Sequence, residues 1–216
     1  MKLVTQEFLL GGAPATWEAP IRKAFVEIKQ AIKNVVWPVG ASSFTINPVL
    51  MGNGVKPIKN GFVAQLNADG WESEVRATLS GELGPGKIDA VKRLPNDALI
   101  AAEWETGNIS SSHRALNKMV IGMLHKRLEA GFLVLPERAL YAFLTDRIGN
   151  VQELRPYFPM WRSLRVGKGV LCILGIEHDS VSNSVPQIPK GMDGNSLVRR
   201  GSPKRKPKHV GPKIAL

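Results

Sequence analysis

Short apolar runs alternate with amphipathic stretches along the second half of the chain, and this order constrains the fold more than any other feature. Residues 98–105, 132–135 and 170–174 are short and largely apolar, as buried strands are. A stretch with helical periodicity, 113–130, separates the first two runs, and a second, 139–144, follows the next. Strands and helices in this order predict an α/β fold, with a central mixed β-sheet flanked by helices.

The predicted helix 113–130 has recognisable signals at both ends. The serines at 110–112 supply capping hydroxyls before it, and Gly131 is a typical residue to close it. An apolar stripe runs along the helix, and a stripe at this spacing usually packs into a core. Its members are Leu116, Met119, Val120, Met123, Leu124 and Leu128.

The N-terminal part of the chain is less regular. Residues 20–34 predict an amphipathic helix that starts at Pro20 and ends before Trp37-Pro38. Residues 43–60 are rich in Asn, Gly and Pro and predict an irregular loop with short extended pieces. Residues 61–66 fit a strand or a short helix, and their periodicity does not separate the two.

The chain is strongly basic, with 29 Lys and Arg residues against 18 Asp and Glu and a formal net charge of +11. Such a chain attracts polyanions, meaning nucleic acid or an anionic membrane surface. Residues 199–216 carry seven of the basic residues and no acid. We therefore expect one domain over residues 1–198 and a flexible basic tail over 199–216 that binds nucleic acid. A solvated extension without a specific partner is the alternative.

The single cysteine, Cys172, lies inside an apolar run, so neither a disulfide within the chain nor a cysteine-based zinc site is expected. The apolar stretch Phe8-Leu9-Leu10 is far too short for a signal peptide or a membrane span. These features predict a cytoplasmic protein that does not enter a membrane.

Three acids form the most informative candidate site. Glu103 and Glu105 share one face of the predicted strand, while Trp104 points to the other face, into the core. Asp89 lies at the start of an upstream strand. Carboxylates placed side by side repel unless a cation lies between them, and Mg²⁺ prefers oxygen ligands. This arrangement suits metal-assisted phosphodiester hydrolysis, although on spacing alone a solvated edge strand is the more common explanation.

A longer run of residues around these acids favours the nuclease interpretation over a solvated edge strand. Residues 103–114, Glu-Trp-Glu-Thr-Gly-Asn-Ile-Ser-Ser-Ser-His-Arg, followed by Asn117-Lys118, closely resemble the core of the BamHI family of restriction endonucleases. Further blocks agree in the same order along nearly the whole chain. They include Trp37-Pro38, Phe44–Asn47, Asn53-Gly54-Val55, Pro57-Ile58-Lys59, Ile88-Asp89, Leu144–Arg147, Glu153-Leu154, Pro156–Phe158, Ile188–Gly191 and Asp193-Gly194.

The resemblance implies a role for each acid. Asp89 and Glu103 correspond to metal-binding carboxylates of the family's active site. Glu105 stands where most relatives of this fold have a lysine, and it would activate or orient the attacking water. Glu74 corresponds to a further metal-binding acid, with Glu72 as the alternative because the surrounding sequence matches poorly.

The resemblance also implies contacts with double-stranded DNA. Base-reading residues of the family correspond to Asn108, Ser110, Arg114, Asp146 and Arg147, whose side chains suit base edges in the major groove. Asp146 and Arg147 pairing with each other at a helix end is the alternative. Lys59 would contact a phosphate. Asp193 and Gly194 lie in a segment that reaches DNA in the family, although Asn195 stands where a methionine is expected.

Taken together, the resemblance predicts a type II restriction endonuclease. It would use Mg²⁺ to cut double-stranded DNA at a GATC-centred palindrome, with GGATCC as the expected site. In the family the long helix packs against its symmetry mate, so a homodimer with one active site per subunit is expected. The alternatives are a related nuclease with another site and a non-catalytic DNA-binding protein whose acids are structural.

Overall fold

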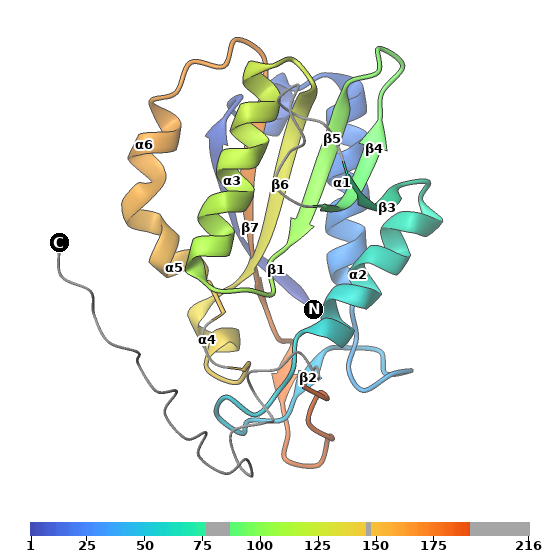
Figure 1. The fold of residues 1–216 in the computed structure, drawn as a ribbon. Helices are drawn as coiled ribbons and strands as arrows, with labels where there is room; N and C mark the ends of the chain where they lie inside the picture. Colours follow the sequence, from blue (N-terminus) through green and yellow to red (C-terminus); the bar gives the residue numbers. More distant parts are fainter. Residues whose placement is uncertain (77–86, 146–147, 191–216) are drawn as a thin grey trace, which may run out of the picture.

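A six-stranded mixed sheet forms the centre of the computed structural model, which describes residues 1–76, 87–145 and 148–190 (Figure 1). Its spatial order is β1-β7-β6-β5-β4-β3. The middle strands β5, β6 and β7 are parallel, and the outer strands are antiparallel to their neighbours. The strands are β1 (Lys2–Leu10), β3 (Glu72–Val75), β4 (Ile88–Arg93), β5 (Leu99–Trp104), β6 (Leu128–Pro136) and β7 (Val170–Glu177).

Helices cover both faces of the sheet, which confirms the predicted α/β architecture (Figure 1). In the described parts of the chain, no helix is long and apolar enough to cross a membrane. A short parallel pair, β2 (Thr45–Ile46) with β8 (Ser180–Val181), lies apart from the sheet. The helices are α1 (Ala19–Lys33), α2 (Lys56–Ala68), α3 (Ile109–Leu124), α4 (Arg138–Tyr141), α5 (Val151–Leu154) and α6 (Phe158–Arg162), with 3-10 turns η1 (Pro14–Thr16) and η2 (Arg155–Tyr157).

Alternation along the strands divides the interior into two hydrophobic cores. On β6, Phe132 and Val134 join the core beneath α1 and α2. The intervening Leu133 and Leu135 join the core beneath α3, α5 and α6. A β-strand places successive side chains on opposite faces, so a continuously apolar strand needs cover on both sides.

Two predictions for the N-terminal half have different outcomes. The helix expected over 20–34 is confirmed as α1. The loop expected over 43–60 is wrong at its end, because α2 begins at Lys56 and absorbs the ambiguous stretch 61–66. Pro57 suits the first turn of α2, whose buried residues Ile58, Phe62 and Leu66 recur every four positions; the surrounding Gly and Asn hid this pattern.

The boundaries of α3 also differ from the prediction over 113–130. Asn108 caps the helix, which starts at Ile109 and ends at Leu124. Leu128 and Gly131 therefore belong to β6, not to the helix and its end. The remaining stripe packs mostly against the chain's own sheet, since Leu116, Met119, Val120 and Met123 are buried. Most of the stripe therefore belongs to the chain's own core.

Three further elements were incompletely predicted. The edge strand β1 was not predicted, although it pairs with β7 over most of its length. The helix expected over 139–144 is the shorter α4, and β7 extends past 174 to Glu177. These are elements whose extent depends on partners distant in sequence, which local patterns do not report.

Gly131 lets α3 approach β6 closely, and we expect Gly131→Ala to destabilise the fold. An added Cβ would lie 2.7 Å from Met119 Sδ and 3.0 Å from Met119 Cβ. Such overpacking typically costs about 1–3 kcal/mol. Urea unfolding of Gly131→Ala, Met119→Ala and the double variant measures the coupling. The glycine substitution should cost less in the Met119→Ala background; strictly additive losses would contradict a direct clash.

Candidate active site

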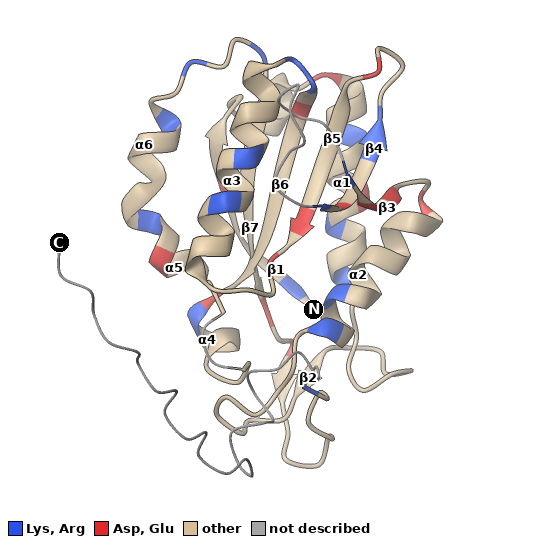
Figure 2. Cartoon of the chain, in the orientation of Figure 1, with Lys and Arg blue, Asp and Glu red and all other residues tan. Residues whose placement is uncertain are grey.

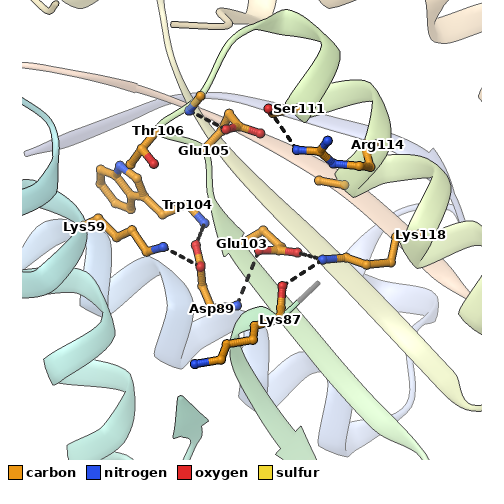
Figure 3. A pocket seen from close by; sticks show the side chains of 12 residues that line it. Lys59, Lys87, Asp89, Glu103, Trp104, Glu105, Thr106, Ser111, Arg114 and Lys118 are labelled. Carbon is orange, nitrogen blue, oxygen red and sulfur yellow. Dashed lines mark hydrogen bonds and ion pairs between the residues drawn. The ribbon is translucent and has the colours of Figure 1, made fainter. Parts of the chain in front are cut away.

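A pocket of about 510 Å³ opens where the end of β5 meets the start of α3 (Figure 3). Acids from β4 and β5 face bases from α2 and α3 across it. Figure 2 shows the same contrast, with acidic residues at the end of β5 near basic residues on α3 and at the start of α2. Among the residues singled out from the sequence, the pocket gathers Asp89, Glu103, Glu105, Lys59 and Arg114.

The strand pattern explains why two acids meet here. Trp104 turns toward the α2 side, where its ring centroid lies 5.0 Å from that of Phe62. Glu103 therefore faces α3, as alternation predicted. Asp89 is held beside it: the Asp89 amide donates to Glu103 Oε2 at 3.4 Å, and Asp89 Oδ2 accepts from the Trp104 amide at 2.9 Å. Both acids are more than nine-tenths buried.

Each buried carboxylate has a lysine partner. Lys59 Nζ lies 2.5 Å from Asp89 Oδ1, and Lys118 Nζ forms an ion pair with Glu103 Oε1. Lys118 also donates to the Lys87 carbonyl at 3.1 Å, which ties α3 to the start of β4. Lys118 lies in the string that resembles the family, but the sequence did not predict it as a site residue. Its spacing from Arg114, one helical turn along α3, was the available signal.

Burial raises the pKa of Glu103 from an ordinary 4.5 to about 7, although Lys118 opposes the shift; the neighbouring Asp89 adds to it. A low-dielectric surrounding penalises the charged form of a carboxyl group. Glu103 is thus a buried acid whose charge needs a nearby cation at neutral pH.

Glu105 lines the same pocket but is turned toward the start of α3 (Figure 3). Its Oε1 accepts a hydrogen bond from the Gly107 amide at 2.5 Å. Burial raises the pKa of Glu105, while hydrogen bonds from Gly107 and Thr106 oppose the rise. A carboxyl group with a raised pKa is better suited to accept a proton near neutral pH than an ordinary one.

Glu74 lies at the rim of this cluster. Its side chain is about half exposed, 3.4 Å from Lys87 Nζ and 3.9 Å from Lys59 Nζ. In the register of β3 and β4, Ser73 pairs with Ala90 and Val75 with Ile88, so Glu74 lies opposite Asp89. Glu72 pairs with Val91, further along β4. The geometry favours Glu74 over Glu72 as the fourth acid, with Lys59 between it and Asp89.

The carboxylate oxygens in the pocket are suitable ligands for a hard divalent cation. Among the described residues, no group of three or more His, Cys, Asp and Glu side chains is arranged to hold a metal. Mg²⁺ is commonly held by one or two carboxylates, with water and substrate phosphates completing its shell. Asp89 and Glu103 supply those two carboxylates, and Lys59 and Lys118 now supply the positive charge.

The candidate base-reading residues lie beside the pocket where the structure describes them. Asn108 caps α3, and its Oδ1 accepts from the Ser111 amide at 3.2 Å. Ser110 and Arg114 are exposed on the first turns of the same helix, and Arg114 Nη2 donates to Ser111 Oγ at 3.2 Å. The other four candidates, Asp146, Arg147, Asp193 and Gly194, lie outside the described residues, as does the tail 199–216.

Comparison with known proteins identifies the family. Residues 1–195 match the family model described as restriction endonuclease BamHI. The type II restriction enzyme OkrAI of Oceanobacter kriegii is 53% identical over 171 residues, 79% of this chain and 88% of OkrAI. The type II restriction enzyme BamHI of Bacillus amyloliquefaciens is 36% identical over 184 residues, 82% and 84% of the two chains. The chain belongs to the BamHI family.

As a member of the BamHI family, the chain is a type II restriction endonuclease, which confirms the resemblance in the sequence. A crystal structure of restriction endonuclease BglII complexed with a DNA 16-mer is also similar. Its TM-score is 0.57 at 11% identity, covering 83% of this chain and 79% of that one. At this identity the similarity shows a shared fold only, and it confirms the predicted restriction-endonuclease-like sheet.

In this BamHI-family chain we expect Lys118→Met to destabilise the metal-free protein most at alkaline pH. The folded pKa of Glu103 is about 7 against an ordinary 4.5, so the folded state loses stability as the pH rises through this window. Without Lys118 the pKa rises further and the loss extends above pH 7. Breaking such a buried pair costs about 3–5 kcal/mol when both groups are charged.

Urea unfolding in EDTA near pH 5 and near pH 8 measures this loss. Glu103→Gln is the control, because it removes the titrating group and should abolish the extra pH dependence of Lys118→Met when the two are combined. An equal loss of stability at both pH values for Lys118→Met alone would contradict the assigned pairing.

Proposed function

We propose that this restriction endonuclease cuts both strands of double-stranded DNA at a GATC-centred palindrome, GGATCC, with Mg²⁺ as cofactor. One observation carries the proposal: the buried acids Asp89 and Glu103 share a pocket with the first turns of α3, where Asn108 and Arg114 are exposed. A nuclease needs its metal site next to the groups that hold the duplex. Both relatives are named type II restriction enzymes, which supports the reaction class.

Six charged residues in and around the pocket have a role in the proposed cleavage. Asp89 and Glu103 would hold Mg²⁺, which would neutralise the phosphate charge and lower the pKa of a bound water. Glu105 orients the attacking water and accepts its proton, consistent with its raised pKa. Lys59 contacts a phosphate, and Lys87, about half exposed at the rim, gives a second cation for the backbone. Glu74, at the rim of the pocket with Lys59 between it and Asp89, is the further metal-binding acid of the proposal.

Sequence recognition is assigned to residues around the same opening. Arg114 suits the O6 and N7 acceptors of guanine, and Asn108 and Ser110 suit acceptors on neighbouring bases. Asp146, Arg147, Asp193 and Gly194 are proposed to read the rest of the half-site, on the strength of their match to the family. The basic tail 199–216 follows the domain 1–198 and would add phosphate contacts.

A homodimer completes the proposal, since a palindromic site presents the same half-site twice. The outer face of α3 and its neighbours carries exposed apolar side chains that a partner subunit would cover. Ile121 and Leu124 lie on α3, and Tyr157 and Met160 lie on η2 and α6 beside it. This face, and not the buried stripe, is the proposed interface. We place the dimer in the cytoplasm, because the enzyme must share a compartment with its DNA.

We expect the wild-type protein to convert plasmid DNA into discrete fragments with Mg²⁺, and fragment-end sequencing to report GGATCC. Asp89→Asn and Glu103→Ala should each reduce cutting by about a thousandfold or more, because each removes a metal ligand. Site-specific binding with Ca²⁺ should survive in both. Glu18→Gln, an exposed acid on the N-terminal side of α1, is the matched control.

Four outcomes separate the alternatives. Discrete fragments with other ends would show a related nuclease with a different site. Plasmid DNA degraded to a smear without discrete fragments would contradict sequence-specific cleavage. Parental cutting rates in both acid variants would show that the metal-ligand assignment is wrong, and absence of cutting with intact binding in the wild type would indicate a non-catalytic DNA-binding protein.

We expect Leu124→Glu to shift the protein from dimer to monomer, because a charge on the covered face would be desolvated on association. Val26→Glu is the control, since Val26 is comparably exposed on α1, on the opposite face of the sheet. Analytical ultracentrifugation over a concentration series measures the dimer dissociation constant of both variants. A dimer of unchanged affinity in Leu124→Glu would place the interface elsewhere.

A further inference from the structure

Asn53 is a fully buried polar residue outside the acid cluster, and its side chain joins three separate segments. Its Nδ2 donates to the Asn47 carbonyl at 2.8 Å and to the Phe143 carbonyl at 2.9 Å. Its Oδ1 accepts from the Ile188 amide at 3.0 Å. The side chain thus satisfies backbone groups 90 and 135 residues away in the sequence.

The backbone around Asn53 strengthens the same junction. The Asn53 amide donates to the Phe143 carbonyl at 3.0 Å, and its carbonyl accepts from the Thr145 amide at 2.7 Å. The Gly54 amide donates to the Ile188 carbonyl at 2.8 Å. Gly54 also permits close contact, since an added Cβ would lie 2.0 Å from the Pro189 carbonyl oxygen. Segments 53–55, 143–145 and 188–190 therefore meet at one point.

Two of these segments lead directly to the pocket. The first continues into α2, and Lys59 in the first turn of α2 forms an ion pair with Asp89. The second is followed by Gly149, whose amide donates to the Gly107 carbonyl at 2.9 Å. Gly149 lies so close to α3 that an added Cβ would be 2.4 Å from Ser112 Oγ. Gly107 in turn holds Glu105 through its own amide.

We propose that Asn53 is a positioning residue for DNA recognition: it fixes segments 53–55, 143–145 and 188–190 relative to one another and to the pocket. Chain continuity gives the reason. Asp146 and Arg147 follow Thr145 directly, and Asp193 and Gly194 follow Lys190 within four residues. The recognition part of this inference rests on the proposed function, while the junction itself does not.

The chemistry of the junction favours an amide side chain. Asparagine offers two donors and an acceptor, and the segments present two carbonyls and one amide within its reach. An apolar residue would leave the Ile188 amide and the Asn47 carbonyl without these bonds in a buried place, where unpaired groups are costly. The segments would then separate or admit water, and the precise geometry that base reading needs would be lost.

The first test compares Asn53→Ala with Ile173→Val, a core truncation on β7 that should lower stability without touching the junction. Without DNA, amide hydrogen exchange at Ile188 should accelerate in Asn53→Ala and remain near the wild-type rate in Ile173→Val. With Ca²⁺, the affinity ratio of the cleaved site to random duplex should fall by about tenfold or more in Asn53→Ala. Binding to random duplex and its salt dependence should stay within about twofold.

A second pair of variants guards against a simple folding defect. Gly54→Ala should force residues 188–190 away and reproduce the loss of discrimination. Gly61→Ala is its control, because an added Cβ in α2 would meet nothing closer than 4.0 Å. Gly61→Ala should behave as the wild type in exchange and in binding.

The outcomes distinguish this inference from the proposed function. Unchanged exchange at Ile188 in Asn53→Ala overturns the junction whatever the DNA results are. Faster exchange with an unchanged affinity ratio overturns the role in recognition. A wild-type protein without any sequence preference refutes the proposed function and the recognition role together, while the exchange data still decide whether Asn53 holds the segments.

Discussion

Repulsion between two buried carboxylates is the constraint on which the pocket depends. Asp89 and Glu103 lie beside each other in the sheet, and each charge is tolerated because a lysine from a helix reaches it. Those lysines fix where α2 and α3 lie along the strands. The protein therefore assembles positive charge around the site before any cation binds, and the same positive charge attracts a phosphate backbone.

Sequence patterns predicted those helices and strands whose own residues show a clear apolar periodicity. Strands β5, β6 and β7 are apolar on both faces, and α1 has a clear stripe, so their residues carried the information. The start of α2 could not be predicted, because Asn, Gly and Pro residues obscured the helical spacing of its apolar residues. The end of α3 was placed too late because Leu128 continues the helical spacing, yet pairing with β5 recruits it into β6.

The candidate site also contains residues that the sequence predicted and contacts that only the folded structure reveals. Alternation put Glu103 on the face opposite Trp104, and Asp89 was recognised as an acid at the start of the upstream strand. The family match supplied the metal-binding roles and the candidate base-reading residues around the start of α3. Neither could reveal Lys118 as the partner of Glu103, since an ion pair between a helix and a strand depends on packing across the sheet. Glu105 was predicted on the same strand face as Glu103, but its carboxylate accepts a hydrogen bond from the Gly107 amide. Only the turn into α3 creates this contact.

Arg114 and Lys118 are one helical turn apart on α3. Arg114 is exposed beside the opening of the pocket, while Lys118 pairs with a buried acid. A substitution that rolls or slides α3 to suit a new base would move both. In the proposed recognition by α3, a new target sequence acquired through this helix would therefore lower the cleavage rate. Divergence should accumulate first in the connecting segments, where a changed preference leaves Glu103 undisturbed.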